Sequence, residues 1–253
     1  MLNNLGIVQA CVHGSLHGDP TRRLGGRSIL EWVVRRVTDA TRLNGVILVT
    51  CDAEPCRAIG RLAPSDVPVF VGSEGDALAR CAKALEQYAA EGVVCVRGDN
   101  LFVDPALIDR LITAAESYPD CDYAGYSLRD GRPAVFSPVR VYAEWFRASA
   151  LQRANRSART PADRADVTRY FFAHPQKFHL RLLPAPAEID RDDVRLAVDI
   201  EEDWDHALAL FEALGPEHLE WRGIARLLDH QPALRRRMAA LNRRRTAASA
   251  LES

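Results

Sequence analysis

An acidic turn after a short apolar run is the segment of this sequence best suited to chemistry. Residues 93–97 read Val-Val-Cys-Val-Arg and are followed by Gly-Asp-Asn, in which the acid is Asp99. A continuous apolar run of this length is typical of a strand buried on both faces. The turn therefore places a carboxylate at the carboxyl end of a strand, where open α/β sheets bind ligands. Asp104 and the proline after it supply an N-cap and a first turn for a helix over residues 106–116.

Asp199 begins a second acidic segment, and its simplest interpretation is structural. It starts a predicted helix over residues 199–214, and Glu202 follows three residues later. This spacing fits an N-cap with its capping-box partner, which needs neither a metal nor a ligand. Asp99 likewise fits an ordinary turn residue. A structural and a chemical interpretation therefore stay open for both aspartates.

The elements that must position these residues alternate between strands and helices. Apolar runs at residues 5–11, 45–50 and 68–71 predict three strands before the one at 93–97. Helical spacing of apolar residues covers 28–38 and 76–90. This order predicts an α/β fold, with a Rossmann-like, mostly parallel sheet and helices on both faces.

The pattern changes after residue 122. Residues 122–128 and 134–142 read as strands around a turn, which predicts an inserted β-hairpin. A glycine and a proline at positions 215 and 216 mark a boundary between an α/β domain, 1–214, and a C-terminal helical tail, 215–253, whose last residues we expect to be disordered. The remaining predicted elements are helices at 143–152 and 166–174, a mobile loop at 155–163, and strands at 177–183 and 195–198.

The tail is apolar at helical spacing and carries two arginine clusters, at residues 235–237 and 243–245. The apolar positions predict that the tail packs on something, either its own domain or a second subunit. We interpret the arginine clusters as a solvated face and a frayed end, with binding of an anionic partner as the alternative.

Composition excludes several classes of protein. The 33 Lys and Arg residues nearly balance 34 Asp and Glu, which argues against a dedicated nucleic-acid binder. No apolar run approaches the roughly 18 residues that span a bilayer, and residues 1–18 lack the basic start of a signal peptide. The six cysteines form no Cys-x-x-Cys pair, and Cys95 lies in an apolar run where a thiol behaves as a small hydrophobe. We expect a reducing, cytoplasmic setting.

Six segments in a fixed order resemble the cytidylyltransferase family of the spore-coat polysaccharide biosynthesis type, which is related to the synthetases that activate acidic sugars as CMP derivatives. Each segment is weak by itself, and their shared order carries the resemblance. The segments are Gln9-Ala10; residues 24–31, Leu-Gly-Gly-Arg-Ser-Ile-Leu-Glu; residues 69–74 with Asp76, Leu78 and Arg80; residues 97–105, Arg-Gly-Asp-Asn-Leu-Phe-Val-Asp-Pro; residues 166–170, Asp-Val-Thr-Arg-Tyr; and residues 196–199, Leu-Ala-Val-Asp, with Glu202 and Asp203.

The resemblance implies a nucleotide-diphospho-sugar transferase-like fold and a homodimer. It also implies a Mg²⁺-dependent transfer of CMP from CTP to a small anionic acceptor, such as an acidic sugar, carboxylate or phosphonate, with release of pyrophosphate. Mg²⁺ prefers oxygen ligands and is usually held by one or two protein carboxylates. By resemblance, Asp99 and Asp199 are the metal ligands and take part in catalysis.

The first loop departs from the family pattern where the triphosphate should bind. Cys11 replaces an arginine of the family and the loop contains no lysine, so we expect Arg22, Arg23 or Arg27 to act in catalysis instead, because a guanidinium fork binds phosphate well. The nucleotide-binding residues that the resemblance implies are Gln9, Ala10, Cys11, Gly14, Ser15, Arg80, Arg97 and Gly98.

Two other functions stay open. A non-catalytic relative would keep the fold and the dimer surface but lose triphosphate binding through its altered first loop. A glycosyltransferase on a similar sheet is less favoured, because it usually needs an Asp-x-Asp motif and this chain has only Gly-Asp-Asn after residue 97.

Overall fold

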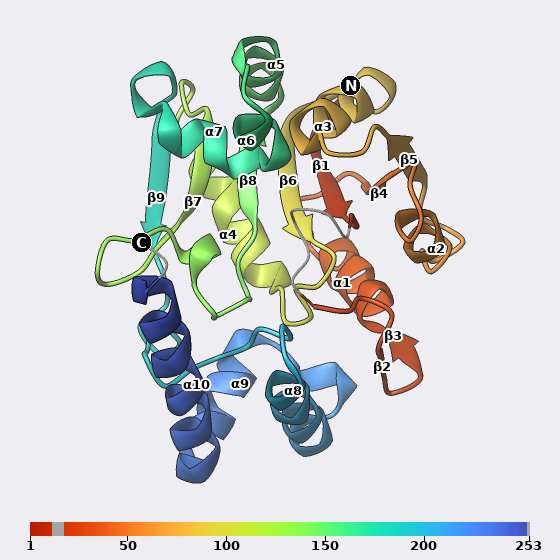
Figure 1. Cartoon of the computed structure of the whole chain (residues 1–253). Helices are drawn as coiled ribbons and strands as arrows, with labels where there is room; N and C mark the ends of the chain where they lie inside the picture. The colour runs from red at the N-terminus through yellow and green to blue at the C-terminus, as the bar shows by residue number, and fades with distance from the viewer. Residues whose placement is uncertain (12–17, 252–253) are drawn as a thin grey trace.

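A seven-stranded sheet forms the centre of the computed structural model, which describes residues 1–11 and 18–251 (Figure 1). In spatial order its strands are β5 (Val69–Gly72), β4 (Val46–Cys51), β1 (Leu2–Gln9), β6 (Ala90–Arg97), β8 (Glu144–Arg147), β7 (Tyr123–Ser127) and β9 (Leu180–Pro184). In this sheet β8 is antiparallel to both of its neighbours, and the other pairings are parallel. The predicted mostly parallel sheet is confirmed.

Helices cover both faces of the sheet, as predicted. Side chains of β6 point alternately to the two faces of the sheet: Val94 and Val96 belong to one hydrophobic core, and Val93 and Cys95 belong to the other. The first core contains α1 (Ile29–Thr38), α4 (Pro105–Glu116), α8 (Glu201–Leu214), α9 (Trp221–Asp229) and α10 (Pro232–Leu251), and the second contains α3 (Ala77–Gln87), α5 (Ala148–Ser157) and α7 (Val167–Ala173). Shorter elements are α2 (Cys56–Gly60), α6 (Pro161–Ala165), and β2 (Arg23–Leu24) paired with β3 (Arg27–Ser28).

The helix that follows the acidic turn is capped as its sequence predicts. The Asp104 carboxylate accepts a hydrogen bond from the Leu107 N–H at 3.1 Å, and the proline occupies the first turn of α4. A second oxygen of Asp104 accepts from the Trp221 N–H at 2.8 Å. The same carboxylate therefore caps α4 and holds the start of α9 against it.

The predicted hairpin is wrong in its second strand. Residues 134–136 form a 3-10 turn, and β8, which follows at residues 144–147, is the strand that pairs with β7. Pro133 precedes the expected strand and Pro138 lies inside it, and a proline lacks the N–H that a ladder requires. Only one isolated bridge, between Ser127 and Pro133, remains of the hairpin in the described chain.

Three further expectations are corrected. The helix predicted at 143–152 begins as strand β8 and becomes α5 only at Ala148, and the loop predicted at 155–163 contains the end of α5 and the start of α6. Residues 195–198 are not a strand of the sheet; the Leu196 N–H instead donates to the Pro138 carbonyl at 2.9 Å. Residues 195–198 therefore lie beside the segment 134–143, and that segment is itself not part of the sheet.

The helical tail packs on its own domain rather than requiring a second subunit. Ile224 and Met238 are fully buried in the same core as α1 and α4, and Arg36 donates to the Leu219 carbonyl at 3.0 Å. In Figure 1 the blue helices α8, α9 and α10 lie together at the bottom of the view. The division at residue 214 stays a prediction, and residues 252–253 lie outside the described chain. In the described chain, no helix combines the length and apolarity that a membrane crossing requires.

Met238→Ala is expected to destabilise the whole chain by about 2–5 kcal/mol, because it removes a fully buried side chain from the core that the tail shares with the sheet. Urea denaturation followed by circular dichroism measures this loss. Arg243→Ala, on the exposed side of the same helix, is the control and should stay within about 0.5 kcal/mol of wild type. Equal stabilities for the two variants would contradict a shared core.

Candidate functional site at the carboxyl edge of the sheet

Neighbouring strands place the end of β1 beside the acidic turn. In the parallel pairing of β1 with β6, Gln9 lies opposite Arg97. The next residue, Gly98, donates its N–H to the Gln9 carbonyl at 2.8 Å, and a Cβ at this position would come within 3.0 Å of the same oxygen. Close approach therefore explains the glycine. The structure brings together these three of the predicted nucleotide-binding residues.

Asp99 and Asp199 meet through one guanidinium, that of Arg140. Its Nη1 lies 3.8 Å from an Asp99 oxygen, and its Nη2 lies 3.2 and 3.3 Å from the two oxygens of Asp199. All three side chains are less than a tenth exposed. The two carboxylates are 100 residues apart in sequence and face the same cation in the fold.

Two further arginines complete this charge cluster. Arg97 donates to both Asp99 oxygens, at 3.1 and 2.7 Å, and Arg245 of α10 donates to Asp199 at 2.7 Å. Arg245 is about half exposed, as expected of a solvated face, and its ion pair with Asp199 is a contact that the sequence did not predict. Burial and the nearby Arg97 lower the pKa of the Arg140 guanidinium, while the two aspartates raise it.

Asp199 does not cap the helix that follows it. Helix α8 begins at Glu201, and it is the Asp203 carboxylate that accepts from the backbone N–H groups of Asp199 and Ile200, at 3.1 and 3.4 Å. Asp203 is itself held by Arg195 at 2.5 and 2.7 Å, and both side chains are buried. The capping interpretation of Asp199 is therefore wrong, and its carboxylate binds arginines instead.

The first loop returns to the acidic turn at Gly18. The Gly18 N–H donates to Asp99 at 3.2 Å, and a Cβ on Gly18 would lie 2.4 Å from the Val198 carbonyl. Only glycine fits between the two acidic segments. Gly14 and Ser15, which the sequence assigned to the nucleotide, lie outside the described residues.

The arginines expected to replace the triphosphate grip lie on or beside the β2–β3 hairpin and have other partners. Arg22 binds Glu201 at 2.7 and 2.8 Å, Arg23 donates to the Gly26 carbonyl at 2.7 Å, and Arg27 lies over the Trp32 ring. None of the contacts described for them reaches Asp99 or Asp199. Their catalytic role stays a prediction.

Arg80, Ala10 and Cys11 are buried next to the site rather than open to it. Arg80 donates to the Ser73 carbonyl at 2.8 Å, and the Ala10 carbonyl accepts from the Thr50 hydroxyl at 2.8 Å. The roles of all three residues in nucleotide binding stay predictions. For Ala10 and Cys11, the predicted role is that of the loop backbone rather than of the side chain.

A small pocket opens beside the arginine cluster, with a cavity volume of about 20 Å³, which is room for about one water molecule. Three of its lining residues have a buried polar atom without a hydrogen-bond partner in the described structure: Asn100 Oδ1, Arg140 Nε and the Tyr142 hydroxyl. Buried polar groups are normally paired, so such atoms indicate a place where a polar ligand gains hydrogen bonds. The polar lining residues are Gln9, Arg97, Asn100, Arg140, Tyr142 and Glu144.

Glu144 is the buried carboxylate in the pocket wall. Its oxygens accept from the Thr168 hydroxyl at 2.7 and 2.8 Å and from the Tyr123 hydroxyl at 2.7 Å. The pKa of its carboxyl is raised to about 7: burial is the main cause and nearby Asp166 adds to it, while the hydrogen bonds from Thr168 and Tyr123 and the charge of Arg97 act in the opposite direction. Sequence reasoning missed Glu144 by assigning it to a helix; the signal was an acid in the apolar run Ala-Glu-Trp-Phe.

Glu144→Gln is expected to remove a pH dependence of stability. Because the pKa of Glu144 is raised from 4.5 to about 7 in the folded chain, its contribution is complete below pH 4.5 and is lost as the pH rises through 7. The free energy of unfolding of the variant, minus that of wild type, should therefore increase by about 3 kcal/mol from acid to pH 8. Urea denaturation across this range measures it, with the exposed Glu188→Gln as control. A difference that stays constant with pH would contradict the assignment.

The profile of the cytidylyltransferase family matches residues 6–231, and the chain therefore belongs to that family. This confirms the resemblance drawn from its motifs and makes the chain a nucleotidyltransferase by membership.

Individual relatives span most of the chain. The uncharacterized protein MJ1063 of Methanocaldococcus jannaschii is 28% identical over 91% of this chain and 92% of its own length. The spore coat polysaccharide biosynthesis protein SpsF of Bacillus subtilis is 28% identical over 83% and 86%.

Solved structures share the fold. A cytidylyltransferase from Leptospira borgpetersenii has a TM-score of 0.76 and 19% identity, covering 92% of this chain and 97% of its own. A CMP:2-keto-3-deoxy-manno-octonic acid synthetase complexed with CTP has a TM-score of 0.60 and 13% identity, covering 83% and 99%. The nucleotidyltransferase-like α/β fold is thereby confirmed.

Proposed function

We propose that this chain is a metal-dependent cytidylyltransferase that transfers CMP from CTP to a small anionic acceptor and releases pyrophosphate. One observation carries the proposal: Asp99 and Asp199 converge on the single cation of Arg140 at the carboxyl edge of the sheet. CTP is the nucleotide bound to the related synthetase structure. The likeness to SpsF supports a role in polysaccharide biosynthesis.

The convergence of two carboxylates fits a divalent metal. Their oxygens already face one cation at 3.2–3.8 Å, and hard oxygen donors are the ligands that Mg²⁺ prefers. Asp99 and Asp199 would hold Mg²⁺, which supplies positive charge to the phosphates of a bound nucleotide. Because Asp199 does not cap α8, its carboxylate has no helix-capping role to lose when it binds a metal.

The arginines around this pair supply the positive charge that the first loop lacks. Arg97, Arg140 and Arg245 outnumber the two aspartates they bind, so the cluster carries a net positive charge. A triphosphate brings negative charge that these guanidiniums can bind once the aspartates hold a metal. This arrangement argues against the non-catalytic alternative, because arginines on other elements supply the positive charge that the first loop has lost.

In this proposal the acidic group of the acceptor reaches the small pocket beside the cluster, and the rest of the acceptor lies at the mouth of that pocket. Arg97 and Arg140 give the pocket a cationic wall suited to a carboxylate, and Asn100 and Tyr142 offer hydrogen bonds to hydroxyls. Glu144 lies in the same wall, and its pKa of about 7 allows it to exchange a proton near neutrality. An acidic sugar combines these features and is the acceptor class we favour.

The proposal includes a cytoplasmic setting and a homodimer. No disulfide joins any of the six cysteines, all of which lie in the described chain, and this supports a reducing compartment. The edge strand β5 exposes Val69 and Val71, and an apolar edge of this kind supports association with a second copy.

Asp99→Asn and Asp199→Asn are each expected to lower pyrophosphate release from CTP by about 100-fold or more, because each removes a metal ligand. Pyrophosphate is measured with Mg²⁺ and a panel of acidic sugars as acceptors. Asp66→Asn, at an exposed aspartate, is the control and should keep full activity. Should wild type show no thermal shift with any of the four nucleoside triphosphates and Mg²⁺, the non-catalytic alternative would replace this proposal.

Arg140→Gln is expected to weaken the binding of CTP with Mg²⁺ by about 10- to 100-fold, because it removes a charged, bidentate donor from the phosphate site. Isothermal titration calorimetry measures the affinity. Arg132→Gln removes an exposed arginine and should leave it unchanged. Equal affinities for both variants would remove Arg140 from the nucleotide site.

A further inference from the structure

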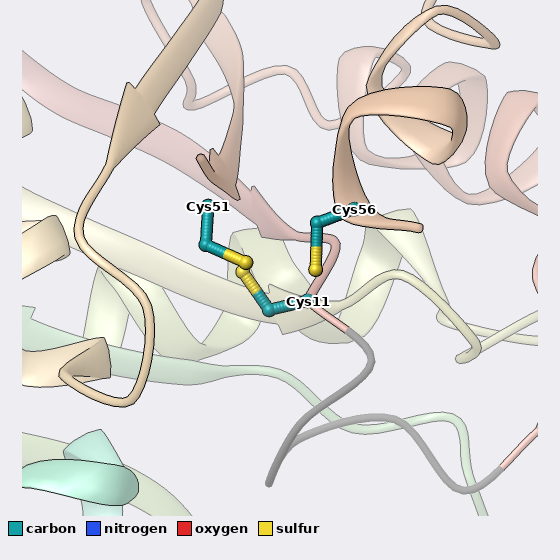
Figure 2. A group of neighbouring side chains, drawn as sticks. All are labelled: Cys11, Cys51 and Cys56. Carbon is teal, nitrogen blue, oxygen red and sulfur yellow. The ribbon is translucent and has the colours of Figure 1, made fainter. Parts of the chain in front are cut away.

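Three cysteines from different segments form a cluster that the proposed transfer reaction does not use. Cys11 follows the end of β1, Cys51 ends β4, and Cys56 begins α2. Figure 2 shows their side chains pointing toward one another. The three sulfurs lie within 4.8 Å of each other, and all three residues are at most 1% exposed.

This spacing is close to that of a thiolate metal site. A Zn–S bond of 2.3 Å in a tetrahedral site sets neighbouring sulfurs about 3.8 Å apart. The limit of 4.8 Å exceeds this by about one ångström, which small side-chain rotations can close. Three sulfur donors select a soft ion rather than the hard Mg²⁺ expected at the aspartates.

A buried cation lies near the cluster to balance its charge. Arg80 is 3% exposed, donates to the Ser73 carbonyl at 2.8 Å, and makes no ion pair with a carboxylate in the described part of the chain. Its charge lowers the pKa of the Cys11 thiol and so opposes burial, which raises it. Three thiolates, one divalent ion and this guanidinium together carry no net charge, which suits a buried site.

We propose that Cys11, Cys51 and Cys56 bind one thiophilic divalent metal ion, such as Zn²⁺, through three thiolates. Binding forms three metal–sulfur bonds and releases three thiol protons to solvent, with no oxidation or reduction. A coordinated thiol loses its proton to the metal even where burial disfavours the free thiolate.

Such an ion would join three segments at the edge that carries the proposed active site. Cys11 comes two residues after Gln9, which pairs with Arg97 beside the acidic turn. A metal would therefore hold the start of the first loop to the end of β4 and to α2. The site stands apart from the proposed CTP reaction, since it shares no ligand with Asp99 or Asp199.

Metal binding to reduced, metal-free protein tests the proposal without measuring activity. One equivalent of Zn²⁺ should bind per chain and release three protons in weak buffer, and Co²⁺ should give the absorption of sulfur-to-metal charge transfer. Cys51→Ser and Cys56→Ser should each weaken binding at least 100-fold. Cys121→Ser is the matched control, because Cys121 is also buried but lies elsewhere, and it should bind normally.

Three results would overturn the proposal. These are binding well below one equivalent, binding that Cys51→Ser and Cys56→Ser leave unchanged, and a disulfide between two of the three cysteines in protein kept under reductant. If the serine variants do not fold, alkylation of unfolding wild type decides instead. Bound Zn²⁺ should slow the alkylation of these three cysteines and not of Cys121, and equal rates would reject the site.

Discussion

The ion pairs of Arg140 with Asp99 and Asp199 are the interaction on which the rest of this site depends. They join the acidic turn after β6 to the segment before α8, and Arg245 extends the connection to the last helix. Removing one member of such a buried cluster typically costs about 3–5 kcal/mol, because a charge is left without a partner. The same charges that hold these segments together are the ones a metal and a triphosphate would use.

The carboxyl edge of the sheet therefore offers two kinds of donor side by side. The end of β6 provides hard carboxylate oxygens, and the ends of β1 and β4 provide soft thiols. Cys11, which stands where the sequence resemblance leads us to expect a phosphate-binding arginine, belongs to the second set. In the proposed function, Arg97, Arg140 and Arg245 supply the positive charge for the phosphates, and they lie on three separate segments.

Predictions from the sequence held where local rules decide the structure. The alternation of apolar runs predicted the sheet and both helical layers, and Asp104 caps α4 as its type and position require. The predictions were wrong where distant segments compete for the same hydrogen-bonding partner. The strand predicted at 134–142 contains Pro138, and β8 pairs with β7 instead. Asp203, and not Asp199, accepts from the N–H groups before the start of α8.

The sequence by itself determined the class of fold, the family and the turn that carries Asp99, because periodicity, caps and turns act over a few residues. The tertiary structure decided that Asp199 meets Asp99, that Arg140 and Arg245 bind them, and that three cysteines converge. Apart from Cys51 and Cys56, which are five positions apart, the residues that these contacts bring together lie from 40 to 100 positions apart. They depend on which strands lie side by side in the sheet, and no local pattern in the chain specifies that.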